Sequence, residues 1–149
     1  MGASSAMARA TALGLATGAR STLGSAPLWP VSGKVGRTLL AASVLGEATG
    51  DKVPGIPSRT AGPSLAARAL SAGTGGALLA RGLGTSTVLS ALVAAAASPV
   101  GAAAGVGWRR YWNGTGRPTW LGGVIEDACA LALARTACRG LGTDASARG

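Results

Sequence analysis

The chain lacks histidine altogether, and aspartate and glutamate make up only five of its 149 residues. Histidine is the commonest metal ligand and the usual general base near neutral pH, so its absence removes most routes to acid–base and metal chemistry. The Gly-x-Ser-x-Gly pattern of a nucleophilic serine and the Lys-Ser or Lys-Thr end of a phosphate-binding loop are also missing. We therefore expect no enzyme, no metal and no cofactor.

Large aromatic side chains and charges are scarce as well. There is no phenylalanine, aromatic residues amount to 3% of the chain, and charged residues to 13%. Soluble domains carry about 25% charged residues. The apolar share of 48% comes mainly from alanine, leucine and valine, beside 25 glycines. Small side chains bury too little area for a good water-soluble core, but they let helices approach closely in a membrane.

The longest uncharged run covers 27 residues, between Arg81 and Arg109. Its main part, from Thr85 to Trp108, consists mostly of alanine, valine, leucine, glycine and serine. A helix of about 24 residues rises roughly 36 Å, which exceeds the hydrocarbon core of about 30 Å. The run predicts a membrane-spanning helix, and so a protein of the cell membrane.

Four further apolar segments accompany this span, and together they predict an all-α, multi-pass transmembrane bundle of about five helices. The predicted helices are Ala8 to Leu28, Val35 to Thr49, Ser64 to Gly82, Thr85 to Trp108 and Trp120 to Cys138. We expect residues 1–138 to form one transmembrane domain and the small, polar residues 139–149 to be a disordered C-terminal tail. The basic residues divide too evenly to fix an orientation by the positive-inside rule.

The first predicted helix contains Arg20 within its apolar part. A cleavable signal peptide is the alternative interpretation of residues 1–26, because Arg9 precedes an apolar stretch and small residues precede Pro27. Arg20 interrupts the apolar core that a signal peptide needs, so we favour a membrane helix.

Aromatic and basic residues gather at the ends of the predicted helices. The aromatic residues are Trp29, Trp108, Tyr111, Trp112 and Trp120, and belts of this kind are typical of membrane interfaces. The net charge of +9 is scattered near the ends of apolar runs, which fits anionic lipid headgroups. No basic helix face or aromatic stacking platform is present. We expect the lipid bilayer and its anionic headgroups as partners, and no nucleic acid.

Small residues and a repeated spacing suggest how the helices pack. Glycines stand four residues apart at positions 14 and 18, 46 and 50, and 101 and 105, a spacing that favours close helix contacts and, on exposed surfaces, a homo-oligomer. Trp29 and Glu47 also stand 79 residues before Trp108 and Glu126. Three helices lie within that offset, so the pattern predicts an inverted repeat, which is typical of transporters.

The densest polar segment is residues 47–59. Glu47 and Asp51 stand four residues apart, Arg59 closes the segment, and prolines and glycines interrupt the helix. One interpretation is an ion or substrate gate at a broken helix. The other, which we favour, is a loop at the membrane surface held by salt bridges.

Glu126 and Asp127 lie about six residues inside the last predicted helix. Ionisable groups within a span are costly and usually face a partner, the bundle interior or a cavity. Arg20 and Arg68 are the intramembrane cations that could pair with them. A protonatable or cation-binding carboxylate and a buried ion pair that fixes helix packing are equally good interpretations. Adjacent acids cannot both point at one arginine.

Arg68 itself lies inside an apolar helix and should not be left unpaired there. We expect it to pair with Glu47 or Asp51 first, and with Glu126 or Asp127 second.

Cys129 and Cys138 are nine residues apart, which places them on opposite faces of one helix. They cannot form a disulfide within that helix, and we expect two buried, reduced thiols.

A family resemblance accompanies these polar motifs. Residues 46–60 (GEATGDKVPGIPSRT), followed by residues 65–73 (LAARALSAG), resemble the small bacterial membrane proteins classed as domain of unknown function 4126. The Glu126-Asp127 pair and residues 18–23 are similar to motifs of the same family, and the resemblance extends to about Cys138. It implies an integral membrane protein without an established activity, and it supplies no catalytic or binding residues.

Two hypotheses of function follow. In the first, the chain is a structural or lipid-interacting membrane protein whose acids and arginines are packing pairs. In the second, it is a small ion- or proton-coupled permease that uses its intramembrane carboxylates. Acids packed one to one on arginines would favour the first hypothesis, and acids lining a wet cavity would favour the second.

Overall fold

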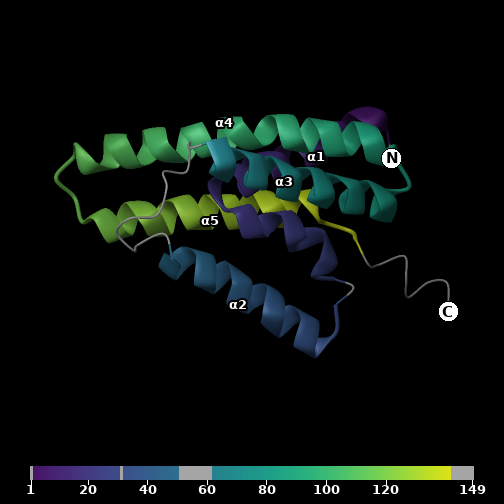
Figure 1. Cartoon of the computed structure of the whole chain (residues 1–149), viewed down its shortest axis with the longest axis horizontal. Helices are drawn as coiled ribbons and strands as arrows, with labels where there is room; N and C mark the ends of the chain where they lie inside the picture. The colour runs from purple at the N-terminus through teal and green to yellow at the C-terminus, as the bar shows by residue number, and fades with distance from the viewer. Residues whose placement is uncertain (1, 31, 51–61, 142–149) are drawn as a thin grey trace.

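The computed structural model describes residues 2–30, 32–50 and 62–141 and is all-α, as expected (Figure 1). Its elements are α1 (Ala3–Ala19), the 3₁₀ helix η1 (Ser21–Leu28), α2 (Lys34–Gly50), α3 (Gly62–Leu83), α4 (Thr87–Asn113) and α5 (Thr119–Ala137). Helices α1, α3, α4 and α5 form the bundle, while α2 lies to one side and packs on η1 (Figure 1).

The first predicted helix is not continuous. It breaks at Arg20, whose φ of −140° and ψ of 113° are extended, and the chain then turns back as η1 (Figure 1). The prediction of one helix from Ala8 to Leu28 was therefore wrong. Apolar composition supports a helix on both sides of Arg20, but it does not report a change of chain direction between them.

One helix meets the length and hydropathy of a membrane span within the described part of the chain. It is α4, with 27 residues, and it continues five residues beyond the predicted end at Trp108. The other predicted spans are shorter or more charged: α1 and α2 have 17 residues each, and α5 contains Glu126, Asp127 and Arg135. The multi-pass arrangement therefore goes beyond what helix length and composition establish.

Helices α1 and α4 lie against each other and run in the same direction. A side chain at Gly14 would meet Ala94, one at Gly18 would meet Ser98, and one at Gly101 would meet the backbone of Leu15. The contact position moves towards the C-terminus on α4 as it does on α1, so the two helices are parallel. Copies inverted in the membrane would place them antiparallel, and the predicted inverted repeat is therefore wrong for this pair.

The same contacts confirm the close packing expected at Gly14, Gly18 and Gly101, while the surroundings of positions 46 and 50 lie outside what the structure describes. The glycines act between helices of one chain. Without a Cβ, the α1 and α4 backbones touch directly.

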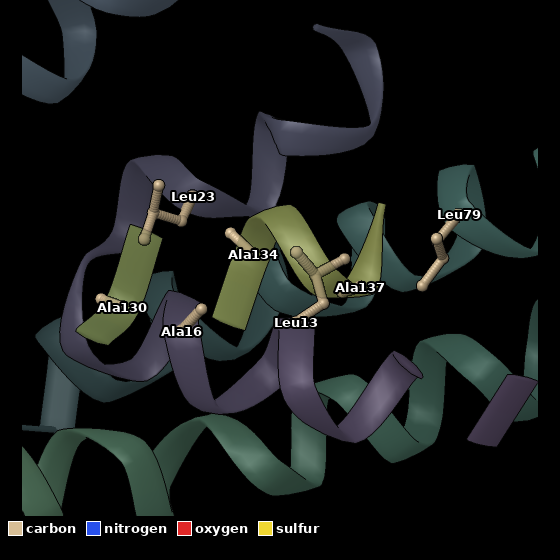
Figure 2. Close-up of a cluster of buried hydrophobic side chains, with 7 residues drawn as sticks. All are labelled: Leu13, Ala16, Leu23, Leu79, Ala130, Ala134 and Ala137. Carbon is tan, nitrogen blue, oxygen red and sulfur yellow. The ribbon is translucent and has the colours of Figure 1, made fainter. Parts of the chain in front are cut away.

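The core is built from small side chains. One cluster joins Leu13 and Ala16 of α1, Leu23 of η1 and Leu79 of α3 to the alanines of α5 (Figure 2). A second cluster consists of three alanines, at positions 10, 72 and 94. The helices can lie this close together because most side chains between them are small.

Many large apolar side chains, in contrast, lie on the outside. Exposed examples occur on every α-helix after the first: Val35, Leu39, Leu45, Leu70, Val88, Leu89, Leu92, Val100, Trp120, Val124, Leu131 and Leu133. This distribution is the reverse of that in a water-soluble domain, where such side chains fill the core.

The predicted tail begins three residues too early. Residues 139–141 continue as turns, and Leu141 packs against the first core cluster. The Arg9 guanidinium also donates a hydrogen bond to the carbonyl of Arg139. Residues 142–149, on which the rest of that prediction falls, lie outside the described residues.

Two glycines of α4 test the close contact with α1. The Gly101→Ala change should lower the free energy of unfolding by about 1–3 kcal/mol, because the new Cβ collides with backbone that cannot move without separating the helices. At Gly107 nothing lies within 4 Å, so Gly107→Ala should be neutral or stabilising by up to about 1 kcal/mol. Thermal unfolding of the detergent-solubilised variants measures both, and equal effects at the two sites would contradict the packing.

Candidate functional site

The break between α1 and η1 gathers most of the buried charge of the described residues. It leaves carbonyl groups at the end of α1 without helical partners, and a buried helix end needs other donors. Arg68 of α3 supplies one such donor, and Ser71, one turn further along α3, binds the carbonyl of the first residue of η1. The Arg68 Nη1 donates to the Gly18 carbonyl at 2.9 Å, and the Ser71 Oγ donates to the Ser21 carbonyl at 2.5 Å.

The position of Arg68 also suits its charge. The C-terminal end of a helix carries a partial negative charge, which favours a nearby cation. Arg68 is buried there, and its Nε additionally donates to the Ser64 Oγ at 3.4 Å. The expected partners Glu47 and Asp51 lie outside the described side chains, so that pairing stays a prediction. Arg59 also lies outside the described residues.

Arg20 pairs with Asp127 of α5. Its Nε and Nη2 lie 2.7 Å and 2.5 Å from the Asp127 Oδ1. The Arg20 side chain is 4% exposed and that of Asp127 is 32% exposed, so the pair reaches from the interior of the bundle towards its surface. The extended backbone at Arg20 sends its side chain towards α5, and the break and the ion pair therefore belong together.

Glu126 pairs with a residue that the sequence did not single out. Its Oε2 lies 2.6 Å from the Nε of Arg109, on α4. Here the acid is the buried partner, 5% exposed, while Arg109 is 39% exposed. Arg109 was missed because it was placed beyond the end of the span at Trp108. The sequence feature that indicates this contact is the short connection between α4 and α5, which brings the two helix ends together.

Glu126 and Asp127 thus pair with two different arginines, because adjacent side chains point in different directions from a helix. Of the two arginines offered as partners for these acids, Arg20 pairs with Asp127. Glu47 lies on α2, but its side chain, like the whole of Asp51 and Arg59, is outside the described residues.

A cavity of about 570 Å³ opens beside these ion pairs, at the end of the bundle where α4 meets α5. Arg20, Arg109 and Asp127 line it together with Trp112 and Trp120. The wall is rigid on the aromatic side, because the Trp112 Nε1 donates to the Pro118 carbonyl at 3.0 Å. Here a predicted acid, Asp127, and a predicted arginine, Arg20, line the same cavity.

The rim of this cavity is basic and aromatic. The Arg117 guanidinium lies 5.4 Å from the centroid of the Trp112 ring, a cation–π contact, and the Trp108 ring packs on Trp112 at 5.3 Å between centroids. We call this region, Trp108 to Trp120, the aromatic end of the bundle.

A second hollow, of about 390 Å³, is a groove between α1, α4 and α5. Its lining is apolar except for Glu126, and includes Ala104, Trp108 and Leu133. The Arg109–Glu126 ion pair connects the two hollows, since Arg109 lines the cavity and Glu126 lines the groove.

Both cysteines are free thiols, which confirms that they do not pair, but the expectation that both are buried was wrong. Cys129 is exposed on α5 and lines the groove. Cys138, which follows α5, is partly buried. Burial raises the pKa of its thiol to about 11, against a smaller lowering by Arg9. Cys138 is therefore a poor nucleophile at neutral pH.

Comparison with known proteins adds no assignment: no family model, no curated protein and no solved structure matches the chain. Among the described residues, no group of three histidine, cysteine or acidic side chains is placed to hold a metal ion.

The Arg20–Asp127 pair makes a testable contribution to stability. The Asp127→Asn change leaves the Arg20 charge buried without its carboxylate and should lower the free energy of unfolding by about 2–3 kcal/mol, less than the roughly 3–5 kcal/mol of a fully buried pair because Asp127 is partly exposed. Replacing both residues by methionine should cost less than Asp127→Asn alone. Thermal unfolding in detergent measures both variants.

The exposed Arg135 of α5 provides the control, since Arg135→Gln should change stability by less than about 0.5 kcal/mol. If Asp127→Asn were as harmless as this control, the pair would not hold the break in place.

Proposed function

We propose that the chain is a multi-pass integral membrane protein with a structural or lipid-interacting role, and that its internal charges are packing pairs. The observation that carries this proposal is the distribution of side chains. Leucines, valines and a tryptophan point outward from α2, α3, α4 and α5, while the interior holds mostly alanine, glycine and a few polar groups. In water this surface would be costly, whereas in a bilayer it faces lipid at no such cost.

The span α4 supports the same proposal. A core helix of a water-soluble protein is mostly buried, but only 33% of the apolar window of α4 is buried. The remaining surface of this helix needs an apolar environment that the described chain does not supply.

The ends of α4 and α5 fit a membrane interface. Tryptophans and a tyrosine at the aromatic end lie beside Arg109, Arg110 and Arg117, the combination that favours the headgroup layer and anionic lipid. The resemblance to domain of unknown function 4126 implies the same location, and the cell membrane is the localisation we propose.

The pairing of charges favours a structural role over transport. Glu126 and Asp127 each form an ion pair with a different arginine, which is what packing pairs require. Within a bilayer such pairs hold helices in one register, since an unpaired charge would be costly there.

One observation favours a permease as the second candidate. Asp127 is 32% exposed and lines the cavity at the aromatic end, so a proton or cation could reach it. A carboxylate within a span that faces a cavity is where a transported cation would bind.

Membrane integration has a direct test in the exposed thiol of α5. The protein should stay in the membrane fraction after alkaline carbonate washing. In resealed vesicles Cys129 should not react with a charged, impermeant maleimide from either side, because it faces lipid. A Thr115→Cys change in the Cys129→Ala background should react from one side, since residue 115 lies in the exposed connection between α4 and α5.

A monodisperse protein purified without detergent, or rapid labelling of Cys129 in sealed vesicles, would contradict the proposal.

Proteoliposomes separate the two candidate functions. We expect an imposed pH gradient to persist as long as in protein-free liposomes, because the carboxylates are held in ion pairs. A protein-dependent collapse of the gradient that Asp127→Asn abolishes and Arg135→Gln leaves intact would replace the structural role by the permease.

A further inference from the structure

We propose that the cavity at the aromatic end and the adjoining apolar groove together bind one anionic phospholipid, with its phosphate in the cavity and an acyl chain in the groove. This inference rests on the proposed membrane location. It goes further, because it assigns a specific lipid class to a specific site.

The cavity carries the charge that an anionic headgroup needs. Two of its lining residues, Arg20 and Arg109, are arginines. Arg110 and Arg117 are exposed at the same end of the bundle. Against these four cations stand the two carboxylates of Glu126 and Asp127, so this end keeps a net positive charge.

Arg109 is the residue placed to bind the phosphate. Its Nε is engaged by Glu126, while 39% of its side chain remains exposed on the cavity side. A guanidinium held at one nitrogen by a buried carboxylate is pre-oriented and can direct its other donors to phosphate oxygens. Asn113 and Thr119 add neutral polar groups to the same wall.

The aromatic residues set the depth of the site. Trp120 is exposed and lines the cavity, and the Trp112 ring forms its inner wall under Arg117. Tryptophans of this kind prefer the layer between headgroups and acyl chains. A phosphate at the depth of these tryptophans would belong to a lipid in the leaflet at the aromatic end.

The groove provides the apolar half of the site. Its volume of about 390 Å³ is lined by side chains such as Leu15, Ile125 and Leu133, and it runs along α4 towards the bundle centre. Ala104 and Gly101 on its floor are small, which leaves the groove open. An extended acyl chain fits such a lining better than a polar solute does.

One ion pair joins the walls of the two hollows, so they are neighbours and we place a single amphiphile across both. The Arg109–Glu126 ion pair has its cation in the cavity wall and its anion in the groove wall. Beside it, the Trp108 Nε1 donates to the Gly122 carbonyl at 2.8 Å, which joins a residue of the groove to one of the cavity. A molecule with a charged head and an apolar tail would lie across this junction.

Lipid binding can be measured on the full chain purified in detergent, by native mass spectrometry during titration with defined lipids. We expect dioleoylphosphatidylglycerol to bind about tenfold more tightly than dioleoylphosphatidylcholine, from the excess of arginines at the site. Glycerol 1-phosphate at millimolar concentration should not displace it, because that solute has no tail for the groove.

Two variants separate the halves of the site. Exchanging the charges, Arg109→Glu with Glu126→Arg, keeps an ion pair but removes the cation from the cavity, and should lower phosphatidylglycerol affinity about tenfold. Ala104→Trp should block the groove and lower the affinity for both lipids. Its matched control is Ala103→Trp, at an exposed position outside the groove lining. Arg81→Gln, in the last turn of α3 and so close in sequence to the start of α4, controls for general loss of charge.

The outcomes are distinct. Selective phosphatidylglycerol binding that is lost in the charge exchange and in Ala104→Trp, but kept in both controls, supports the site. If the exchanged pair does not fold, Ala104→Trp against Ala103→Trp decides alone. Equal binding of the two lipids, or displacement by glycerol 1-phosphate, would overturn it. A protein that resists carbonate extraction yet shows no lipid selectivity fails this inference only, whereas one soluble without detergent fails the proposed function.

Discussion

The end of α1 is the constraint on which the rest of the bundle depends. A helix that stops inside the molecule exposes carbonyl groups and a partial negative charge where water cannot satisfy them. The Arg68 guanidinium of α3 donates to the Gly18 carbonyl at this end, Ser71 donates to the Ser21 carbonyl just after it, and Arg20, at the break, pairs with Asp127 of α5. The positions of α3 and α5 around α1 follow from these bonds.

Close packing and charge placement are coupled at this point. The Gly18 carbonyl accepts from Arg68 of α3, while the missing Cβ atoms of Gly14 and Gly18 let the same part of α1 lie tightly on α4. On the other side, Gly24 and Gly75 bring η1 and α3 into backbone contact. Larger residues at these positions would lengthen the hydrogen bonds at the break, so the small-residue composition serves the polar network as well as the apolar core.

Composition and periodicity predicted the helices to within a few residues, but not the break. The sequence around Arg20 does not show whether the helix continues or ends there. The contacts that decide this come from residues far away in the sequence. Arg109 was missed for a related reason: the boundary at Trp108 followed the loss of hydropathy, whereas α4 continues to Asn113. The direction of α4 relative to α1 is likewise a tertiary property, and sequence spacing alone gave the opposite result.

The environment decides what the two ion pairs contribute. In water, pairs with one partner a third exposed would contribute at most about 1 kcal/mol each, because solvent screens them. In a bilayer the alternative to pairing is an isolated charge near hydrocarbon, which costs several kcal/mol, so the same contacts become strong determinants of helix position. In the membrane location that we propose, the outward leucines and valines of α4 and α5 face lipid, and these pairs lie in the second setting. A network that would be marginal in a soluble bundle can then fix the register of α5 against α1 and α4, and it does so with only two acids among the described side chains.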